Sequence, residues 1–191
     1  MKALIVGNRP LGSKVIELAK DKLVVAADAG ADRLLKYNII PDQIIGDLDS
    51  ISDKATTKLE EWIVSNKNIQ KTDLEKATDY AFEKGASEIQ IIGWSGGRID
   101  HTLAALGLAF NPRISLIDEH FTVEAVTDSK TIEGEECTLF SLMAMPEARV
   151  SVTGARWNLQ HEKLKMGGRG VHNEIGSSGK VNIECHSGNL L

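Results

Sequence analysis

The sequence predicts an α/β protein: an N-terminal doubly wound, mostly parallel sheet with helices on both faces, followed by a small antiparallel β-sandwich or barrel. Short, unbroken apolar runs alternate with longer amphipathic segments up to about residue 118. Beyond that point, apolar and polar residues alternate in short runs without helical periodicity. No Pro- or Ser-rich linker separates the halves, so we expect two closely packed domains at 1–118 and 119–191.

The apolar runs of the first half predict buried parallel strands, because both faces of each run are apolar. These strands are expected at 2–7, 22–27, 43–46, 88–93 and 114–118. Helices are expected at 11–20, 30–37, 53–66, 73–84 and 100–110, with a short strand near 68–70. In the third helix, Leu59, Trp62 and Ile63 have the i, i+3, i+4 spacing of a buried face.

The second half predicts short antiparallel strands separated by Gly, Asn or charged turns. The alternating runs lie at 121–127, 137–143, 148–154, 169–175 and 180–188.

Composition excludes several classes of function. The net charge of -5, without a basic arm, argues against non-specific binding of nucleic acid. Cys137 and Cys185 lack the spacing of metal ligands and are interpreted as reduced thiols. The apolar run before Gly7 is too short for a signal segment or a membrane span. We therefore expect a cytoplasmic protein that acts on neither nucleic acid nor membrane.

Aspartates follow four of the expected strands, at Asp28, Asp47, Asp73 and Asp100. Ligands of open α/β sheets bind outside the carboxyl ends of the strands, where these side chains are expected to gather. Asp is also favoured at helix starts, and capping explains Asp28 and Asp100 better when each is taken singly. The capping box of Thr72 with Glu75 leaves Asp73 without such a role.

The pair Asp47 and Asp49 predicts a metal site. Residues two apart in an extended or turning segment project to the same side, so these carboxylates would repel each other without a cation. Mg²⁺ prefers carboxylate oxygens and substrate phosphates. Ser50 or Ser52 can cap the following helix, which frees both aspartates from capping.

The segment 93–101, GWSGGRIDH, predicts a phosphate-binding loop. Glycines let the backbone expose its N–H groups to a ligand, and Arg98 can bind phosphate oxygens in a bidentate manner. The chain has neither a Walker motif nor a dinucleotide fingerprint. His101 is as well explained by packing or capping as by catalysis. The residues alone indicate Mg²⁺-dependent phosphoryl or nucleotidyl transfer, without naming a substrate.

Four ordered motifs resemble the thiamine pyrophosphokinase family. They are ADAGAD (27–32), PDQIIGDLDS (41–50), TDLEKA (72–77) and GGRIDHTLA (96–104). The resemblance extends from about Ala27 to the chain end. It implies an enzyme that transfers the diphosphoryl group of ATP to the hydroxyl of thiamine. It also implies a homodimer whose thiamine sites lie between the α/β domain of one subunit and the β domain of the other.

The resemblance implies a role for each matching residue. The predicted Mg²⁺ ligands and catalytic residues are Asp47, Asp49 and Asp73, with Asp100 at the thiamine end and also catalytic. The predicted ATP contacts are Asp28, Gly96, Gly97 and Arg98. The predicted thiamine contacts are Asp100, Trp157, His172 and Asn173.

This chain departs from the family pattern at two places. His172 stands where the family often has Ser, and Gln70 corresponds to a Gln frequent upstream of the T-D motif in a register that the sequence does not fix. The opening GNRP (7–10) resembles a less constrained part of the family and is given no role. Trp157 is predicted to stack on thiamine, with a core or dimer-interface position as the alternative.

Three other functions remain open at this point. A pyrophosphokinase for another heterocyclic alcohol, such as a hydroxymethylpterin, would need the same carboxylates. A non-catalytic nucleotide- or thiamine-binding module would not need all of them. A glycosyltransferase with a D-x-D motif fits Asp47 and Asp49, but not Asp73 or Asp100.

Overall fold

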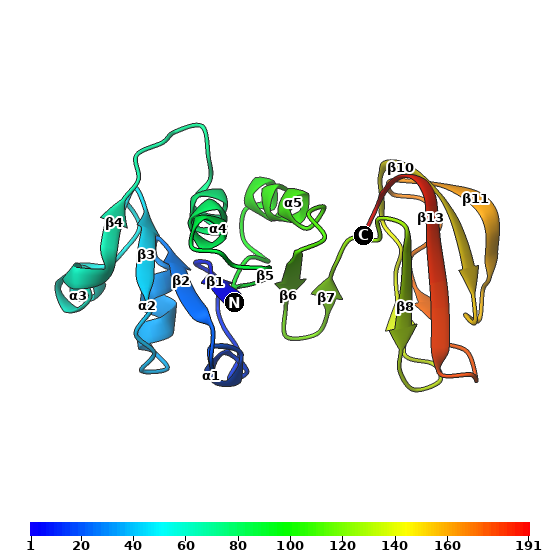
Figure 1. Ribbon diagram of the computed structural model, residues 1–191, viewed down its shortest axis with the longest axis horizontal. Coiled ribbons are helices and arrows are strands. Elements are labelled where there is room, and N and C mark those ends of the chain that lie inside the picture. Colours follow the sequence, from blue (N-terminus) through cyan, green and yellow to red (C-terminus); the bar gives the residue numbers. More distant parts are fainter. The chain divides into compact units, whose positions relative to one another are not determined.

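The computed structural model describes every residue from Met1 to Leu191 and divides the chain into two compact units, Met1–Val123 and Glu124–Leu191 (Figure 1). The first unit continues past the expected boundary at residue 118, because residues 122–123 still pair with its sheet. No helix is long and apolar enough to cross a membrane.

The first unit is built on one seven-stranded sheet. Across the sheet the strands are β4 (Ile63–Ser65), β3 (Gln43–Gly46), β2 (Leu23–Ala27), β1 (Lys2–Val6), β5 (Glu88–Ile92), β6 (Ile114–Ile117) and β7 (Thr122–Val123). All neighbouring strands run parallel except β6 and β7. The predicted doubly wound, mostly parallel sheet is therefore confirmed, with the order reversing between β1 and β5.

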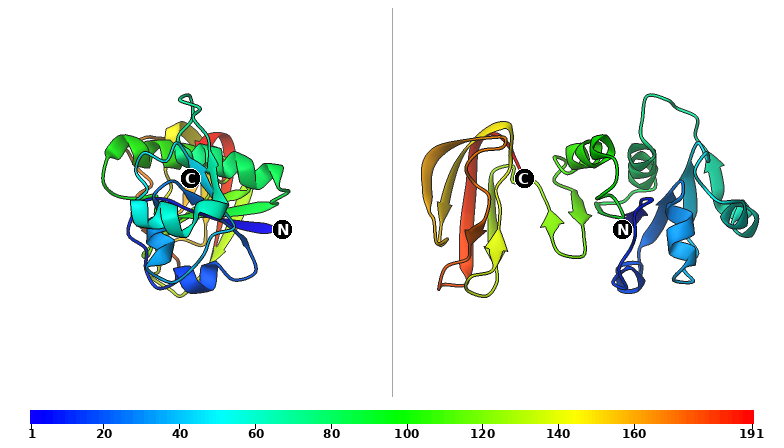
Figure 2. Two further views of the ribbon diagram at one scale, coloured as in Figure 1. Left: turned by 90° about the vertical axis from the view of Figure 1, so that its left-hand side faces the viewer. Right: turned by 180° about the vertical axis from the view of Figure 1, so that it is seen from behind.

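Helices cover both faces of this sheet. They are α1 (Val15–Leu18), α2 (Gly30–Leu35), α3 (Asp53–Lys58), the 3₁₀ turn η1 (Glu60–Trp62), α4 (Asp73–Glu83) and α5 (Ile99–Leu108). Figures 1 and 2 show α4 and α5 on one side of the sheet and α1 and α2 on the other. Leu4 and Val6 of β1 pack with Val15 and Leu34 in one buried cluster. Alternate residues such as Ile5 face the side covered by α4.

The segment after α3 differs from the prediction. The helix expected over 53–66 ends at Lys58, and the chain forms η1 and then strand β4 instead. Ile63 of β4 pairs with Ile44 of β3, and Trp62 and Ile63 still pack against the core. The strand expected at 68–70 is wrong, because Asn66 and Asn68 form side-chain turns in an exposed loop there. Helix α1 is also shorter than the expected 11–20.

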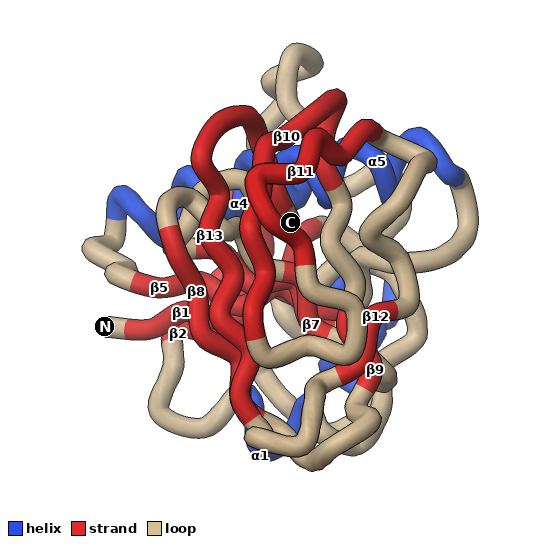
Figure 3. Tube along the Cα trace, turned by 90° about the vertical axis from the view of Figure 1, so that its right-hand side faces the viewer, coloured by secondary structure: helices blue, strands red, loops and turns tan.

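The second unit is an antiparallel β-sandwich (Figure 3). Its larger sheet has the order β11 (Leu159–Lys165), β10 (Ala144–Thr153), β13 (Lys180–Leu190) and β8 (Ser129–Glu133). Its smaller sheet pairs β12 (Asn173–Glu174) with β9 (Leu139–Phe140). Both sheets contribute to one core, in which Phe140 packs against a cluster that contains Val150 and Ile183.

Strands β8 and β11 were not predicted from the sequence. The sequence of β11, LQHEKLK, is mostly polar, and only Leu159 and Leu164 are buried in the core. The run expected at 121–127 contributes β7 to the sheet of the first unit and no strand to the second.

Candidate active site

A cavity of about 530 Å³ lies at the carboxyl ends of β1, β2, β3 and β5 in the first unit. Its walls are the loops that leave these strands and the first turns of α4 and α5. The charged and polar residues that line it include Asn8, Arg9, Asp28, Asp47, Asp73, Lys76, Arg98 and His101. Ligands of open α/β sheets bind at this end, next to the point where strand order reverses.

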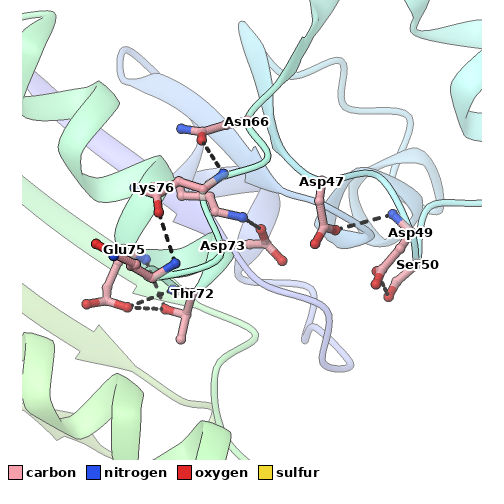
Figure 4. Close-up of polar contacts among 10 residues, drawn as sticks. Asp47, Asp49, Ser50, Asn66, Thr72, Asp73, Glu75 and Lys76 are labelled. Atoms are coloured by element: carbon pink, nitrogen blue, oxygen red, sulfur yellow. Dashed lines mark hydrogen bonds and ion pairs between the residues drawn. The ribbon is translucent and has the colours of Figure 1, made fainter.

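Three carboxylates converge in this cavity. Oxygen atoms of Asp28, Asp47 and Asp73 lie within 4.8 Å of one another. Asp28 follows β2, Asp47 follows β3 and Asp73 begins α4, so three separate chain segments meet here. Figure 4 shows Asp47 and Asp73 directed toward each other from opposite walls. Carboxylates this close repel one another unless a cation lies between them.

Asp28 is the buried member of the cluster. The residue is only 4% exposed, and its Oδ1 atom has no hydrogen-bond partner. Burial, and next the negative charge of Asp73, raise the pKa of Asp28 above its usual range. Gly46 permits this position, because a Cβ atom there would lie 2.9 Å from the Asp28 Cβ. A buried, unsatisfied carboxylate oxygen facing two other carboxylates fits a site for a hard divalent cation.

Asp49 lies outside this group of three, although the sequence placed it with Asp47. Leu48 between them has φ of 69° and packs against the apolar core, so the segment turns instead of extending. The Asp49 carboxylate accepts a hydrogen bond from Ser50 Oγ at 2.7 Å, and its backbone N–H donates to Asp47 Oδ1 at 3.4 Å. Its charge still contributes to the raised pKa of Asp28.

Serine caps the next helix, as predicted for this segment. Ser52 is the N-cap of α3, and its side chain accepts a hydrogen bond from the Ala55 N–H. Neither Asp47 nor Asp49 therefore caps this helix.

Asp73 is free to face the cavity because its neighbours cap the helix. Thr72 and Glu75 form the predicted capping box at the start of α4. Asp73 instead pairs with the ammonium of Lys76 at 2.8 Å. Lys76 is itself buried and lines the cavity, so it offsets part of the negative charge of the cluster. Lys76 was not predicted as a site residue, although it lies inside the TDLEKA motif.

The glycine-rich loop leads into α5. Gly96 and Gly97 have φ of 85° and 80°, a conformation that favours glycine. Arg98 binds Asp100 with two hydrogen bonds of 2.5 and 3.1 Å, although its side chain is 73% exposed. The Arg98 guanidinium lowers the pKa of Asp100 to about 2. Asp100 is therefore ionised at neutral pH, and it forms a salt bridge with the Arg98 guanidinium.

The loop after β1 also reaches the cavity, although its sequence was given no role. Asn8 and Arg9 line the wall beside the glycine-rich loop. Arg33 of α2 holds Asn8 through hydrogen bonds to its carbonyl and side-chain oxygens. The sequence carried no signal for this contact, because Arg33 and Asn8 lie 25 residues apart in the chain.

Three of the four predicted thiamine residues, Trp157, His172 and Asn173, lie in the second unit, whereas Asp100 lies in the first. Trp157 is 49% exposed, and the guanidinium of Arg156 lies 4.6 Å from its ring centre. The buried Asn173 side chain accepts a hydrogen bond from the Trp157 N–H and donates one to the Trp157 carbonyl. Arg156 is in turn bound by Glu174 at 2.9 and 3.0 Å. The exposed His172 has φ of 64° and donates its backbone N–H to Ser141.

Two family models cover most of the chain. The model for "Thiamin pyrophosphokinase, catalytic domain" matches residues 16–118, and the model for "Thiamin pyrophosphokinase, vitamin B1 binding domain" matches residues 127–190. The chain belongs to the thiamin pyrophosphokinase family. The resemblance inferred from the four motifs is thereby confirmed.

Individual relatives agree with this assignment. A thiamine pyrophosphokinase of Bacillus subtilis (strain 168) is 29% identical over 158 residues, which cover 76% of this chain and 74% of the relative. The crystal structure of a thiamine pyrophosphokinase from Bacillus subtilis matches with a TM-score of 0.84 at 25% identity, over 100% of this chain and 96% of that one. The thiamin pyrophosphokinase of Candida albicans shares the fold, with a TM-score of 0.84 at 18% identity, over 99% of this chain and 86% of that one.

Proposed function

We propose that this chain transfers the diphosphoryl group of ATP to the hydroxyl of thiamine, giving thiamine diphosphate and AMP. The observation that carries the proposal is the convergence of Asp28, Asp47 and Asp73 in the segment matched by the catalytic-domain model. The match of residues 127–190 to the vitamin B1 binding model supports thiamine as the acceptor.

Asp28, Asp47 and Asp73 would hold Mg²⁺. The unpartnered Oδ1 of Asp28 and the all-oxygen donor set fit this ion. When bound, Mg²⁺ supplies positive charge that stabilises the phosphate oxygens during transfer. Asp49 stays a predicted ligand, and its charge already acts on Asp28.

The transfer needs positioning and charge neutralisation more than covalent help. The hydroxyl oxygen of thiamine forms a bond to the β-phosphorus while the bond from that phosphorus to the α,β-bridging oxygen breaks. AMP leaves, and the hydroxyl proton passes to solvent. Asp100, ionised because of its lowered pKa, would accept a hydrogen bond from the hydroxyl and orient it. Gly96, Gly97 and Arg98 would contact the phosphates.

In the second unit, Trp157 would stack on the cationic thiamine ring. Trp157 is 49% exposed, although the Arg156 guanidinium lies 4.6 Å from its ring centre, and both of its backbone polar groups are bound by Asn173. Asn173 would thus serve thiamine binding by holding Trp157, with the exposed His172 beside it.

The assembly and the compartment are parts of the same proposal. Residues of the second unit leave five large apolar side chains exposed, at Leu139, Met143, Trp157, Met166 and Val171. A homodimer would cover such side chains, and light scattering of the purified chain tests it. Two free cysteines support a reducing, cytoplasmic location.

Product analysis tests the function. The chain is incubated with ATP, Mg²⁺ and thiamine, and the products are identified by mass spectrometry. Thiamine diphosphate with an equal amount of AMP is the expected result. AMP formed only with a hydroxymethylpterin would instead establish the pterin alternative, and no AMP with either alcohol would indicate a binding module.

A further inference from the structure

The chain segment that leaves β1 is fixed in place by several contacts. The N–H groups of Gly7 and Arg9 donate to the carbonyls of Ile92 and Gly93 at 2.9 and 3.0 Å, which extends the pairing of β1 with β5. The side chain of Arg33 binds Asn8 between them. The backbone of Arg9 is therefore positioned at the cavity wall before any ligand arrives.

The Arg9 side chain lies against one particular glycine. A Cβ atom on Gly97 would lie only 2.4 Å from the Cζ and Nη1 atoms of Arg9. A Cβ atom on the neighbouring Gly96 would meet nothing within 4 Å, although both glycines have similar positive φ. The positive φ angle thus explains why glycine is favoured at both positions. Only at Gly97 does the absence of a side chain also leave space for the Arg9 guanidinium.

Arg9 differs from the other Lys and Arg side chains of the cavity. Each of the others has a carboxylate partner: Lys71 with Asp79, Lys76 with Asp73, and Arg98 with Asp100. Arg9 is half-buried as a residue, and its guanidinium makes no salt bridge and no side-chain hydrogen bond. A guanidinium has five N–H donors, and withdrawing them from water without a partner is unfavourable. An anionic ligand in this cavity would provide the missing acceptors.

We propose that Arg9 binds the polyphosphate of ATP and that Gly97 provides the space in which its guanidinium lies. The inference rests on the proposed function for the identity of the anion. A guanidinium matches phosphate oxygens in a bidentate geometry. The packing against Gly97 leaves Arg9 unpaired beside the three aspartates, so a phosphate ligand has no internal salt bridge to break at this residue.

Calorimetric binding of MgATP and of magnesium tripolyphosphate tests the proposal. We expect Arg9→Gln to weaken both by about 10- to 100-fold, as the loss of charge-assisted hydrogen bonds does. Arg9→Lys should recover only part of this loss, and the KM for thiamine should stay unchanged. Arg113→Gln removes the same charge outside the cavity and should bind both ligands as the natural chain does.

The two glycines provide a second, matched test. Gly96→Ala and Gly97→Ala bear a similar backbone strain, but only Gly97→Ala displaces Arg9. Gly97→Ala should therefore weaken tripolyphosphate binding more than Gly96→Ala does. In the Arg9→Gln background this difference should disappear, because the two changes act on one contact. Circular dichroism identifies any variant that fails to fold.

Two results would overturn the proposal: Arg9→Gln binding within about twofold of the natural chain, or equal effects of the two alanine changes in the natural background. If the natural chain makes thiamine diphosphate while Arg9→Gln binds normally, the inference alone fails. If the natural chain makes no thiamine diphosphate but loses tripolyphosphate binding with Arg9→Gln, the proposed function fails and the inference stands.

Discussion

The cavity of the first unit and the Trp157 cluster of the second unit differ in how far their side chains have partners within the chain. In the cavity, the buried Oδ1 atom of Asp28 has no hydrogen-bond partner. The Arg9 guanidinium, which lines the same cavity, has no carboxylate partner. Around Trp157, by contrast, Asn173 binds the tryptophan backbone and Glu174 binds Arg156. The first site is electrostatically incomplete without charged ligands, whereas the second already holds a fixed aromatic face.

This difference indicates how each region contributes to one reaction. Charged groups that lack partners are stabilised most by bound ions, because a cation and a polyphosphate supply the opposite charges that the folded chain does not provide. A ring whose supports are satisfied gains mainly from contact with a flat, cationic ligand. Substitutions should therefore act on catalysis and ion binding in the first unit, and on thiamine affinity and local stability in the second.

The largest effect is expected for Asp47→Asn. Removing one of the three convergent charges should lower AMP formation at least about 100-fold, since it removes electrostatic stabilisation of the transferred group. Asp53→Asn removes an acid of α3 outside the cavity and should leave the rate unchanged. Steady-state assays measure both, and full activity of Asp47→Asn would contradict the metal assignment.

Asp49→Asn, measured in the same assay, tests whether Asp49 is also a metal ligand. An equally large loss would place Asp49 among the metal ligands. A smaller loss would leave it as a charge that acts on Asp28 from outside the group of three.

Asn173→Ala should act on stability. The substitution removes hydrogen bonds from both backbone groups of Trp157 and should destabilise the second unit by about 2 kcal/mol. Hydrogen exchange at the Trp157 amide reports this loss directly, because that N–H donates to Asn173. Asn182→Ala, at an exposed site, is the matched control. Equal protection of Trp157 in the two variants would remove Asn173 from its positioning role.

Trp157→Ala should raise the KM for thiamine by about 10-fold, which is the size of a partly desolvated cation–π contact. The KM for ATP should not change, because the proposed ATP contacts all lie in the first unit. Trp157→Phe keeps an aromatic face and should fall between the natural chain and Trp157→Ala. A parallel rise in both KM values would count against stacking.

The smallest expected effect is that of Asp28→Asn on the free energy of unfolding, and its sign depends on whether Mg²⁺ is present. The pKa of Asp28 is raised in the folded chain, so its ionised form opposes folding at neutral pH. Without metal, the substitution should raise the free energy of unfolding at pH 7 by about 1 kcal/mol. The gain should shrink as the pH falls through the raised pKa, where Asp28 becomes neutral.

Added Mg²⁺ should reverse the order of the two proteins, because it stabilises the natural chain through Asp28 and the variant less. Urea titrations at several pH values, with EDTA or with Mg²⁺, measure this. A variant less stable than the natural chain in EDTA at pH 7 would contradict the unfavourable ionisation of Asp28.

Features that depend on neighbours in the sequence could be predicted. The capping box of Thr72 and Glu75 and the cap at Ser52 are local, and the apolar runs located the central strands correctly. A general property of parallel sheets predicted that Asp28, Asp47 and Asp73 lie at one end of the sheet. It did not predict which three form the cluster, because Asp49 was expected there and Asp28 was assigned to ATP.

Features that depend on tertiary packing could not be predicted. Leu48 turns into the core and directs Asp49 away from the carboxylate group. The space for Arg9 is provided by Gly97, far along the chain, and no local pattern connects them. The polar strand β11 forms because β10 pairs with it, which its own composition does not reveal.

The most direct test of the central claim follows both phosphoryl groups at once. The chain is given thiamine, Mg²⁺ and ATP labelled with ¹⁸O at the non-bridging oxygens of its β- and γ-phosphoryl groups. The masses of the products are measured with and without EDTA. We expect thiamine diphosphate that carries both labelled groups, unlabelled AMP, and loss of both products with EDTA or in Asp47→Asn. Undiminished product under either of those conditions, or no labelled thiamine diphosphate from the natural chain with Mg²⁺, would contradict metal-dependent diphosphoryl transfer.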